Sequence, residues 1–110
     1  MKIIYNKTIP FGQFHAINLF GVLFAKGPCN DRVINHESIH TAQLKDFFYV
    51  IFYVLYFIEW IYNLLKYRDF YRAYLNISFE REAYLNESDF DYLKYRKHFS
   101  SFKYLRESKI

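Results

Sequence analysis

The sequence predicts a mostly helical α+β fold forming a single domain over residues 1–110, and three observations predict it. Hydrophobic residues make up 53% of the chain and aromatic residues 24%, enough to fill one core. Three Gly and two Pro are few for a protein built from many tight turns. Strand-prone residues come first, and helical periodicity follows them. We therefore expect a small N-terminal hairpin or sheet, a helix carrying a histidine motif, a long aromatic helix, and two or three C-terminal helices.

Residues 1–27 are predicted to be extended, with two or three short strands. Residues 3–5 are β-prone, residues 10–12 read Pro-Phe-Gly and indicate a turn, and residues 16–26 have the content of a strand. Gly21 lies inside this last run and favours a bulge or a hairpin bend over one straight strand.

The next predicted element is a helix over residues 32–44. Asn30 or Asp31 can cap it, because their short side chains accept hydrogen bonds from the amides of a first helical turn. His36 and His40 recur four residues apart, as they would on one face of this helix.

Residues 47–65 form the most apolar stretch, and a helix of this length would be roughly 28 Å long. Its two sides differ. Amphipathic groups lie on one side: Tyr49, Tyr53, Tyr56, Trp60 and Asn63. Apolar groups lie on the other: Phe47, Val50, Ile51, Val54, Ile58, Ile61 and Leu65. A row of phenol hydroxyls suits a wet cleft or an interfacial position, so we expect a buried or surface-docked helix, with a transmembrane span as the alternative.

The remainder is expected to contain a polar, aromatic connector over residues 68–76 and short helices beyond it. These helices are expected over residues 77–87, capped by Asn76 or Ser78; through residues 92–96, capped by Ser88 or Asp89; and over residues 102–106, after an interruption at Ser100-Ser101.

The motif with a chemical meaning is His36-Glu37-Ser38-Ile39-His40. On a helix, His36 and His40 can offer imidazole nitrogens to one zinc ion. Glu37 is displaced by about 100° around the helix axis, so it can reach a water on the metal rather than the metal itself. Zinc lowers the pKa of that water, and Glu37 can take its proton as general base. The spacing therefore predicts one Zn²⁺ per chain.

A catalytic zinc takes three protein ligands, so one more ligand must come from elsewhere in the chain. Gln43 and Asp46 stand where an extended His-Glu-x-x-His-x-x-Gly-x-x-His motif would need Gly and His. We favour Glu80 on the predicted helix over residues 77–87, because Ala83 beside it would let two helices approach closely. The alternatives are Glu82 first, then His98, Glu87 and His15. Stabilisation of an oxyanion is assigned to His98 or Tyr84.

The motif and the downstream segment Phe79-Glu80-Arg81-Glu82-Ala83-Tyr84 together resemble the gluzincin peptidases. The closer likeness is to the catalytic domains of CAAX prenyl endopeptidases and beta-lactam-sensor antirepressor peptidases, whose third ligand begins a Glu-x-x-x-Asp motif. Tyr84 stands where that Asp is expected, and Glu87, one turn on, could substitute for it. The length also resembles the minigluzincins. That resemblance implies that a strand, here residues 16–24, lines the cleft, and that a terminal segment can occupy it in a latent state.

These observations predict a zinc-dependent endopeptidase acting on a peptide or an unfolded protein segment. The alternative is a small membrane-associated or interaction protein with a non-catalytic zinc site; a third possibility is a zinc-free protein with an accidental motif. The net charge of +4 without a dense basic stripe favours anionic membranes over nucleic acid. No signal peptide is convincing, and the single Cys29 excludes an internal disulfide, so we expect a cytoplasmic or membrane-associated protein.

Overall fold

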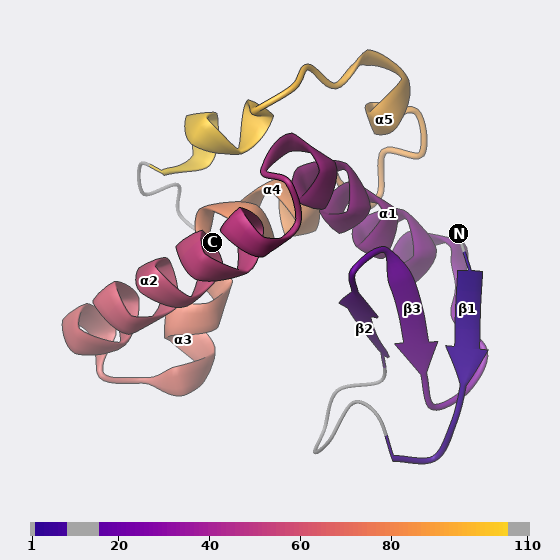
Figure 1. Cartoon of the computed structure of the whole chain (residues 1–110), viewed down its shortest axis with the longest axis horizontal. Helices are drawn as coiled ribbons and strands as arrows, with labels where there is room; N and C mark the ends of the chain where they lie inside the picture. Colours follow the sequence, from indigo (N-terminus) through magenta and orange to yellow (C-terminus); the bar gives the residue numbers. More distant parts are fainter. Residues whose placement is uncertain (1, 9–15, 106–110) are drawn as a thin grey trace.

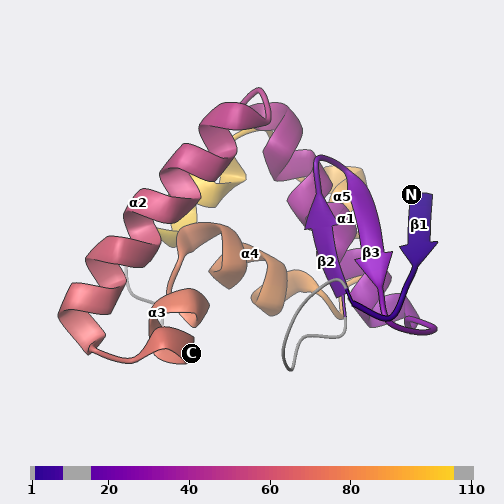
Figure 2. The ribbon, with the colours of Figure 1, turned by 60° about the horizontal axis from the view of Figure 1, so that its bottom comes forward.

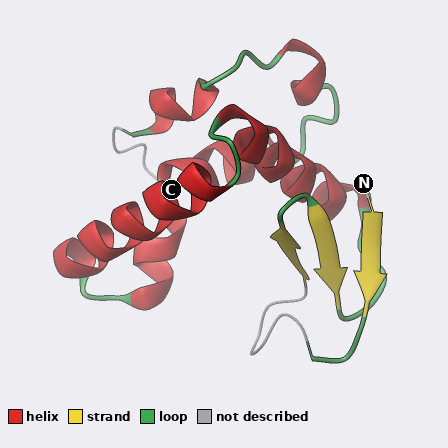
Figure 3. Cartoon of the chain, in the orientation of Figure 1, coloured by secondary structure: helices red, strands yellow, loops and turns green. Residues whose placement is uncertain are grey.

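The computed structural model describes residues 2–8 and 16–105, and it confirms the α+β, mostly helical class. The strands are β1 (Lys2–Tyr5), β2 (Ala16–Leu19) and β3 (Val22–Ala25). The helices are α1 (Asp31–Asp46), α2 (Val50–Tyr67), α3 (Phe70–Leu75), α4 (Ser78–Asn86) and α5 (Tyr92–Tyr95), followed by the 3-10 helix η1 (Ser100–Tyr104). The sheet lies beside α1, and α2 extends away from it (Figures 1 and 3). The turn predicted at residues 10–12 and the candidate His15 lie outside the described residues.

The three strands form one sheet in the order β1-β3-β2. β1 runs parallel to β3, and β2 pairs antiparallel with β3. The β2–β3 connection consists of Phe20 and Gly21, both with positive φ (53° and 88°). Two such residues twist a two-residue hairpin in the sense that strands prefer, which confirms the bend predicted at Gly21. β2 is left at an edge of the described sheet, next to α1.

α1 and α2 meet at a sharp turn, and α4 lies between the two arms that they form (Figure 2). Asn30 caps α1 by accepting a hydrogen bond from the Val33 amide at 2.9 Å, as predicted. The turn into α2 places Phe48 and Tyr49 at positive φ, a conformation that non-glycine residues seldom adopt. The main core lies between the arms and consists of Leu44, Phe47, Phe52, Ile77 and Phe79.

α2 is long and apolar enough to cross a membrane by length and composition, yet only 11% of its 18-residue window is buried. The two predicted sides are present, and the amphipathic one faces the protein: Tyr53, Tyr56 and Trp60 pack against the core. Most of the apolar side is exposed; Phe47, in the turn before α2, is buried instead.

Two predictions just after residue 67 are wrong in detail. The connector over residues 68–76 contains α3, which Asp69 caps by accepting from the Arg72 amide. Neither Asn76 nor Ser78 caps α4; its N-cap residue is Ile77, and the Glu59 carboxylate of α2 accepts from the Ser78 amide at 2.9 Å instead. A cap supplied from another helix leaves no local signal.

The last two elements also differ from their predictions. α5 is a single turn, and its N-cap residue is Asp91 rather than Ser88 or Asp89. The Asp89 carboxylate instead accepts a hydrogen bond from the Asp91 amide. Ser100 and Ser101 do not interrupt a helix; both are buried inside η1.

Candidate metal centre

α1 places the motif side chains on the face that it turns toward α4. His36, Glu37 and His40 are buried, and one ligand atom from each lies within 4.8 Å of the others, so the group could hold a metal ion. The four-residue spacing accounts for this, because it stacks the two imidazoles one helical turn apart. Their ring centroids are 4.8 Å apart, and their Nε2 atoms are 3.2 Å apart.

α4 brings Glu80 to the same point. Its Oε1 lies 3.2 Å from His36 Nε2 and 3.1 Å from His40 Nε2. Ligand atoms that share one metal ion at bond lengths of about 2.0–2.1 Å lie about 3.3 Å apart at tetrahedral angles, so the spacing of these three atoms is compatible with a shared metal ion. The close approach of the helices depends on Ala83, which is fully buried with Ile39 of α1.

Glu37 lies beside this triangle rather than in it. Its Oε2 is 3.8 Å from His36 Nε2. Burial raises the pKa of Glu37, although the two histidines oppose the shift. The Glu37 carboxylate is close enough to the two histidines to belong to the group that could hold a metal ion.

The outer ring nitrogens of both histidines are also bonded, which turns both Nε2 atoms inward. Glu87 Oε1 is 2.9 Å from His36 Nδ1, and Gln43 Oε1 is 2.7 Å from His40 Nδ1. Such partners orient metal-binding histidines and raise their basicity. Glu87 thus occupies the supporting position expected of the missing Asp.

Tyr56 of α2 orients the third carboxylate. Its hydroxyl donates to Glu80 Oε2 at 2.7 Å, which leaves Oε1 facing the histidines. Burial would raise the pKa of Glu80, but the neighbouring His40 and His36 hold it below the ordinary value. Sequence reasoning missed both Tyr56 and Gln43. Gln43 at three residues after His40 was a usable signal, whereas one tyrosine among twelve was not.

Glu82 and His98 lie away from the two histidines, whereas Tyr84 contacts one of them. The Glu82 carboxylate is bonded to Arg96 and Ser101 on the far side of α4. His98 is exposed and pairs with Asp46 at 2.8 Å. The Tyr84 ring packs edge-on against His36, and its hydroxyl is 2.8 Å from that of Tyr74.

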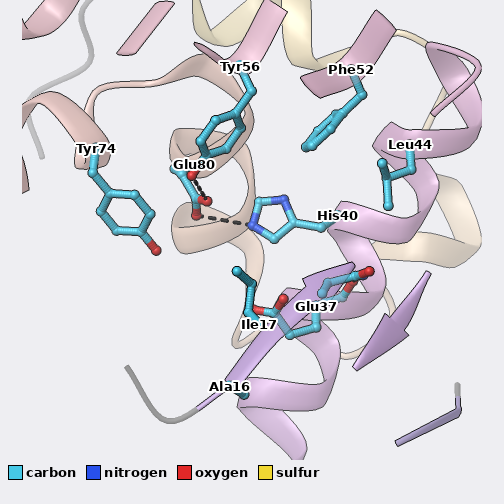
Figure 4. A pocket seen from close by; sticks show the side chains of 10 residues that line it. Ala16, Ile17, Glu37, His40, Leu44, Phe52, Tyr56, Tyr74 and Glu80 are labelled. Carbon is cyan, nitrogen blue, oxygen red and sulfur yellow. Dashed lines mark hydrogen bonds and ion pairs between the residues drawn. The ribbon is translucent and has the colours of Figure 1, made fainter. Parts of the chain in front are cut away.

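A cavity of about 270 Å³ opens onto this centre. Figure 4 shows Tyr74 and Tyr56 across it from Glu37, with His40 and Glu80 between them. Its lining residues are Ala16, Ile17, Asn18, Glu37, His40, Leu44, Phe52, Tyr56, Tyr74 and Glu80. Ala16, Ile17 and Asn18 of β2 therefore form one wall, whereas residues 19–24, which the resemblance also placed in the cleft-lining strand, do not line the cavity. No described residue after Glu80 lines the cavity, so the described C-terminal segment does not occupy it.

No family model, curated protein or solved structure matches this chain. The comparisons thus give no support to the likeness to gluzincins, and the structure supports only a His-Glu-x-x-His cluster that could bind a metal ion.

Proposed function

We propose that the protein is a zinc-dependent endopeptidase. The observation that carries the proposal is the triangle of His36 Nε2, His40 Nε2 and Glu80 Oε1, with sides of 3.1–3.2 Å, opening onto a cavity. Two imidazoles and one carboxylate are a donor set typical of catalytic zinc in peptidases. A bound zinc ion would act as a Lewis acid and lower the pKa of a water molecule toward neutrality.

The roles of the protein's own residues follow from their positions. Glu37 accepts a proton from the attacking water and returns it to the leaving amine. Tyr74 stands across the cavity from Glu37, and burial raises the pKa of its hydroxyl, which therefore keeps its proton. We assign to Tyr74 the donation of a hydrogen bond to the developing oxyanion, with Tyr84 holding its hydroxyl in place.

The proposed substrate is an extended peptide or an unfolded protein segment. β2 lies at an edge of the described sheet and lines the cavity, so a peptide backbone can pair with it as an added strand. Ile17, Leu44 and Phe52 give the cavity apolar walls, which favours an apolar substrate side chain next to the cleaved bond.

The test separates metal binding from turnover. The purified protein should contain one zinc per chain and cleave an unfolded protein. Glu80→Gln should lose the zinc, whereas Glu37→Gln should retain it and lose cleavage. Asp31→Asn, an exposed acid at the start of α1, is the matched control and should retain both.

Two outcomes would redirect the proposal. If Glu37→Gln loses the zinc as well, Glu37 is a fourth ligand, and the closed site favours the structural, non-catalytic alternative. Cleavage that persists in Glu37→Gln would contradict the mechanism outright.

A further inference from the structure

The outward side of α2 is an apolar surface that no described element covers. It includes Val50, Val54, Phe57, Ile58, Ile61 and Leu65, with exposed fractions from 36% at Ile61 to 74% at Leu65. We call these six residues the outer face. Between Val50 and Leu65 the only Asp, Glu, Lys or Arg is Glu59, and it faces inward.

Three polar groups in the middle of α2 have partners on the inner side. Glu59 accepts from Ser78, Tyr56 donates to Glu80, and Asn63 donates to the Ala73 carbonyl at 3.2 Å. A helix on a water-soluble surface has the reverse arrangement, with its polar side in solvent. Polar groups turned toward the protein and an uninterrupted apolar side turned away are the arrangement found where the surrounding medium is lipid.

The charges at the two ends of α2 favour lipid over a second copy of the chain. Lys45 is exposed before the helix, and Lys66 and Arg68 are exposed at its end. Packing two outer faces together, in either direction, would bring basic ends close to each other. Anionic headgroups would instead attract both ends, and the overall charge of +4 acts in the same sense.

The neighbours of α2 indicate that it lies along a membrane rather than through it. α3 runs beside α2 on its inner side and carries the exposed Arg72 (Figure 2). The β2–β3 turn is also close, because the Phe20 amide donates to the Tyr53 hydroxyl at 2.9 Å. In a spanning orientation this charge and the edge of the sheet would lie at hydrocarbon depth, where neither is tolerated when it contacts lipid.

We infer that the outer face of α2 embeds in the surface of an anionic lipid bilayer, with the helix axis parallel to the membrane plane and its basic ends among the headgroups. This inference does not rest on the proposed peptidase activity, because the outer face and the metal centre lie on opposite sides of α2.

The binding experiment uses the full chain with Glu37→Gln and two kinds of vesicle, phosphatidylcholine alone and phosphatidylcholine with about 30% phosphatidylglycerol. We expect cosedimentation with the anionic vesicles that weakens with salt. Ile58→Asp should lower the partition coefficient by at least about tenfold. Leu85→Asp, on α4 with 52% exposure against 56% for Ile58, is the matched control and should bind as the parent does. Circular dichroism and urea unfolding verify the fold of each variant.

The orientation experiment is simple because the chain has a single natural cysteine, which can be replaced before new cysteines are introduced. In a Cys29→Ser background, a polarity-sensitive dye is attached in turn to Val50→Cys, Ile58→Cys and Leu65→Cys. Equal, shallow depths for the three dyes support the inference, and a maximum depth at Ile58 would overturn it in favour of a spanning helix. The inference would also be overturned if Leu85→Asp lost as much vesicle binding as Ile58→Asp. A third outcome would overturn it as well: the protein does not bind vesicles, and it self-associates in a way that Ile58→Asp abolishes. That result would assign the outer face to contact with a second copy of the chain.

Discussion

Glu80 and Glu82 are two positions apart on α4, both are buried, and their surroundings differ completely. Glu82 lies 2.5 Å from Arg96 Nε, and Arg96 Nη1 in turn lies 2.9 Å from Asp46. A permanent cation therefore sits between two carboxylates. Glu80 faces two imidazoles whose nitrogens converge on its own Oε1.

The comparison shows how a structural ion cluster can be told from a candidate metal centre. The Glu82 cluster carries its own cation, and burial would raise the pKa of Glu82, but hydrogen bonds from Arg96, Ser101 and Tyr92 lower it. The Glu80 cluster brings three possible ligand atoms to one point, and its positive charge in the metal-free protein is the proton on His40, which a metal ion can replace. Gln43 connects the two clusters, because it accepts from His40 and donates to Glu82 at 3.0 Å.

The largest expected effect comes from removing the cation of the structural cluster. Arg96→Met leaves Glu82 and Asp46 buried without their partner, and we expect a loss of about 3–5 kcal/mol in the free energy of unfolding, measured with urea on metal-depleted protein. Lys94→Met is the matched control: Lys94 pairs with Asp91 in an exposed position, so its loss should be below about 1 kcal/mol. Glu80→Gln should cost less than Arg96→Met under these conditions. Equal costs would contradict the distinction between the clusters.

A smaller effect is expected where the clusters meet. Gln43→Leu removes the acceptor for His40 Nδ1, so the imidazole loses its fixed orientation, and zinc affinity should fall about 10–100-fold in competition with a chromophoric chelator. Ser38→Ala lies in the same motif but only removes a hydrogen bond to the Ile34 carbonyl, and its affinity should be unchanged. An unchanged affinity in Gln43→Leu would show that His40 is oriented by other contacts.

The sequence was informative where a local pattern determines a structural outcome. Histidines four residues apart share a helix face in any α-helix, Asn30 is a strong helix cap, and Gly21 suits a positive φ. The segment around Glu80 could be identified because its Phe-Glu-x-x-Ala pattern placed a carboxylate beside a small residue. The structure brings Glu80, and not Glu82, to the two histidines.

The features that escaped prediction depend on tertiary contacts. Glu59 binds the start of α4 from a position nineteen residues away in sequence, and Tyr56 reaches Glu80 across twenty-four. Periodicity divided α2 into two sides but could not say which one faces the protein, because that depends on what the polar side chains find there. α3 was missed because its cap, Asp69, lies in a segment too short to show periodicity.

The remaining two predictions concern protons at the candidate metal centre. Burial would lower the pKa of His40, but the Glu80 carboxylate raises it to about 10, against an ordinary value of 6.5. In metal-depleted protein this pair should therefore stabilise the fold fully below about pH 6.5 and lose that contribution as the pH rises through 10. Urea unfolding across this range should show the decline, and Glu80→Gln should flatten it.

The same protonated His40 must release its proton when a metal takes its Nε2 lone pair. Zinc binding near neutral pH should therefore release about one proton from His40, which calorimetry in buffers of different ionisation enthalpy can count. The structural cluster provides the contrast, since Arg96 has no proton to release in this range. Arg96→Lys should leave the proton count unchanged if the two clusters are chemically separate. If Arg96→Lys changes the number of protons released, the two clusters are coupled through Gln43 more tightly than its hydrogen bonds imply.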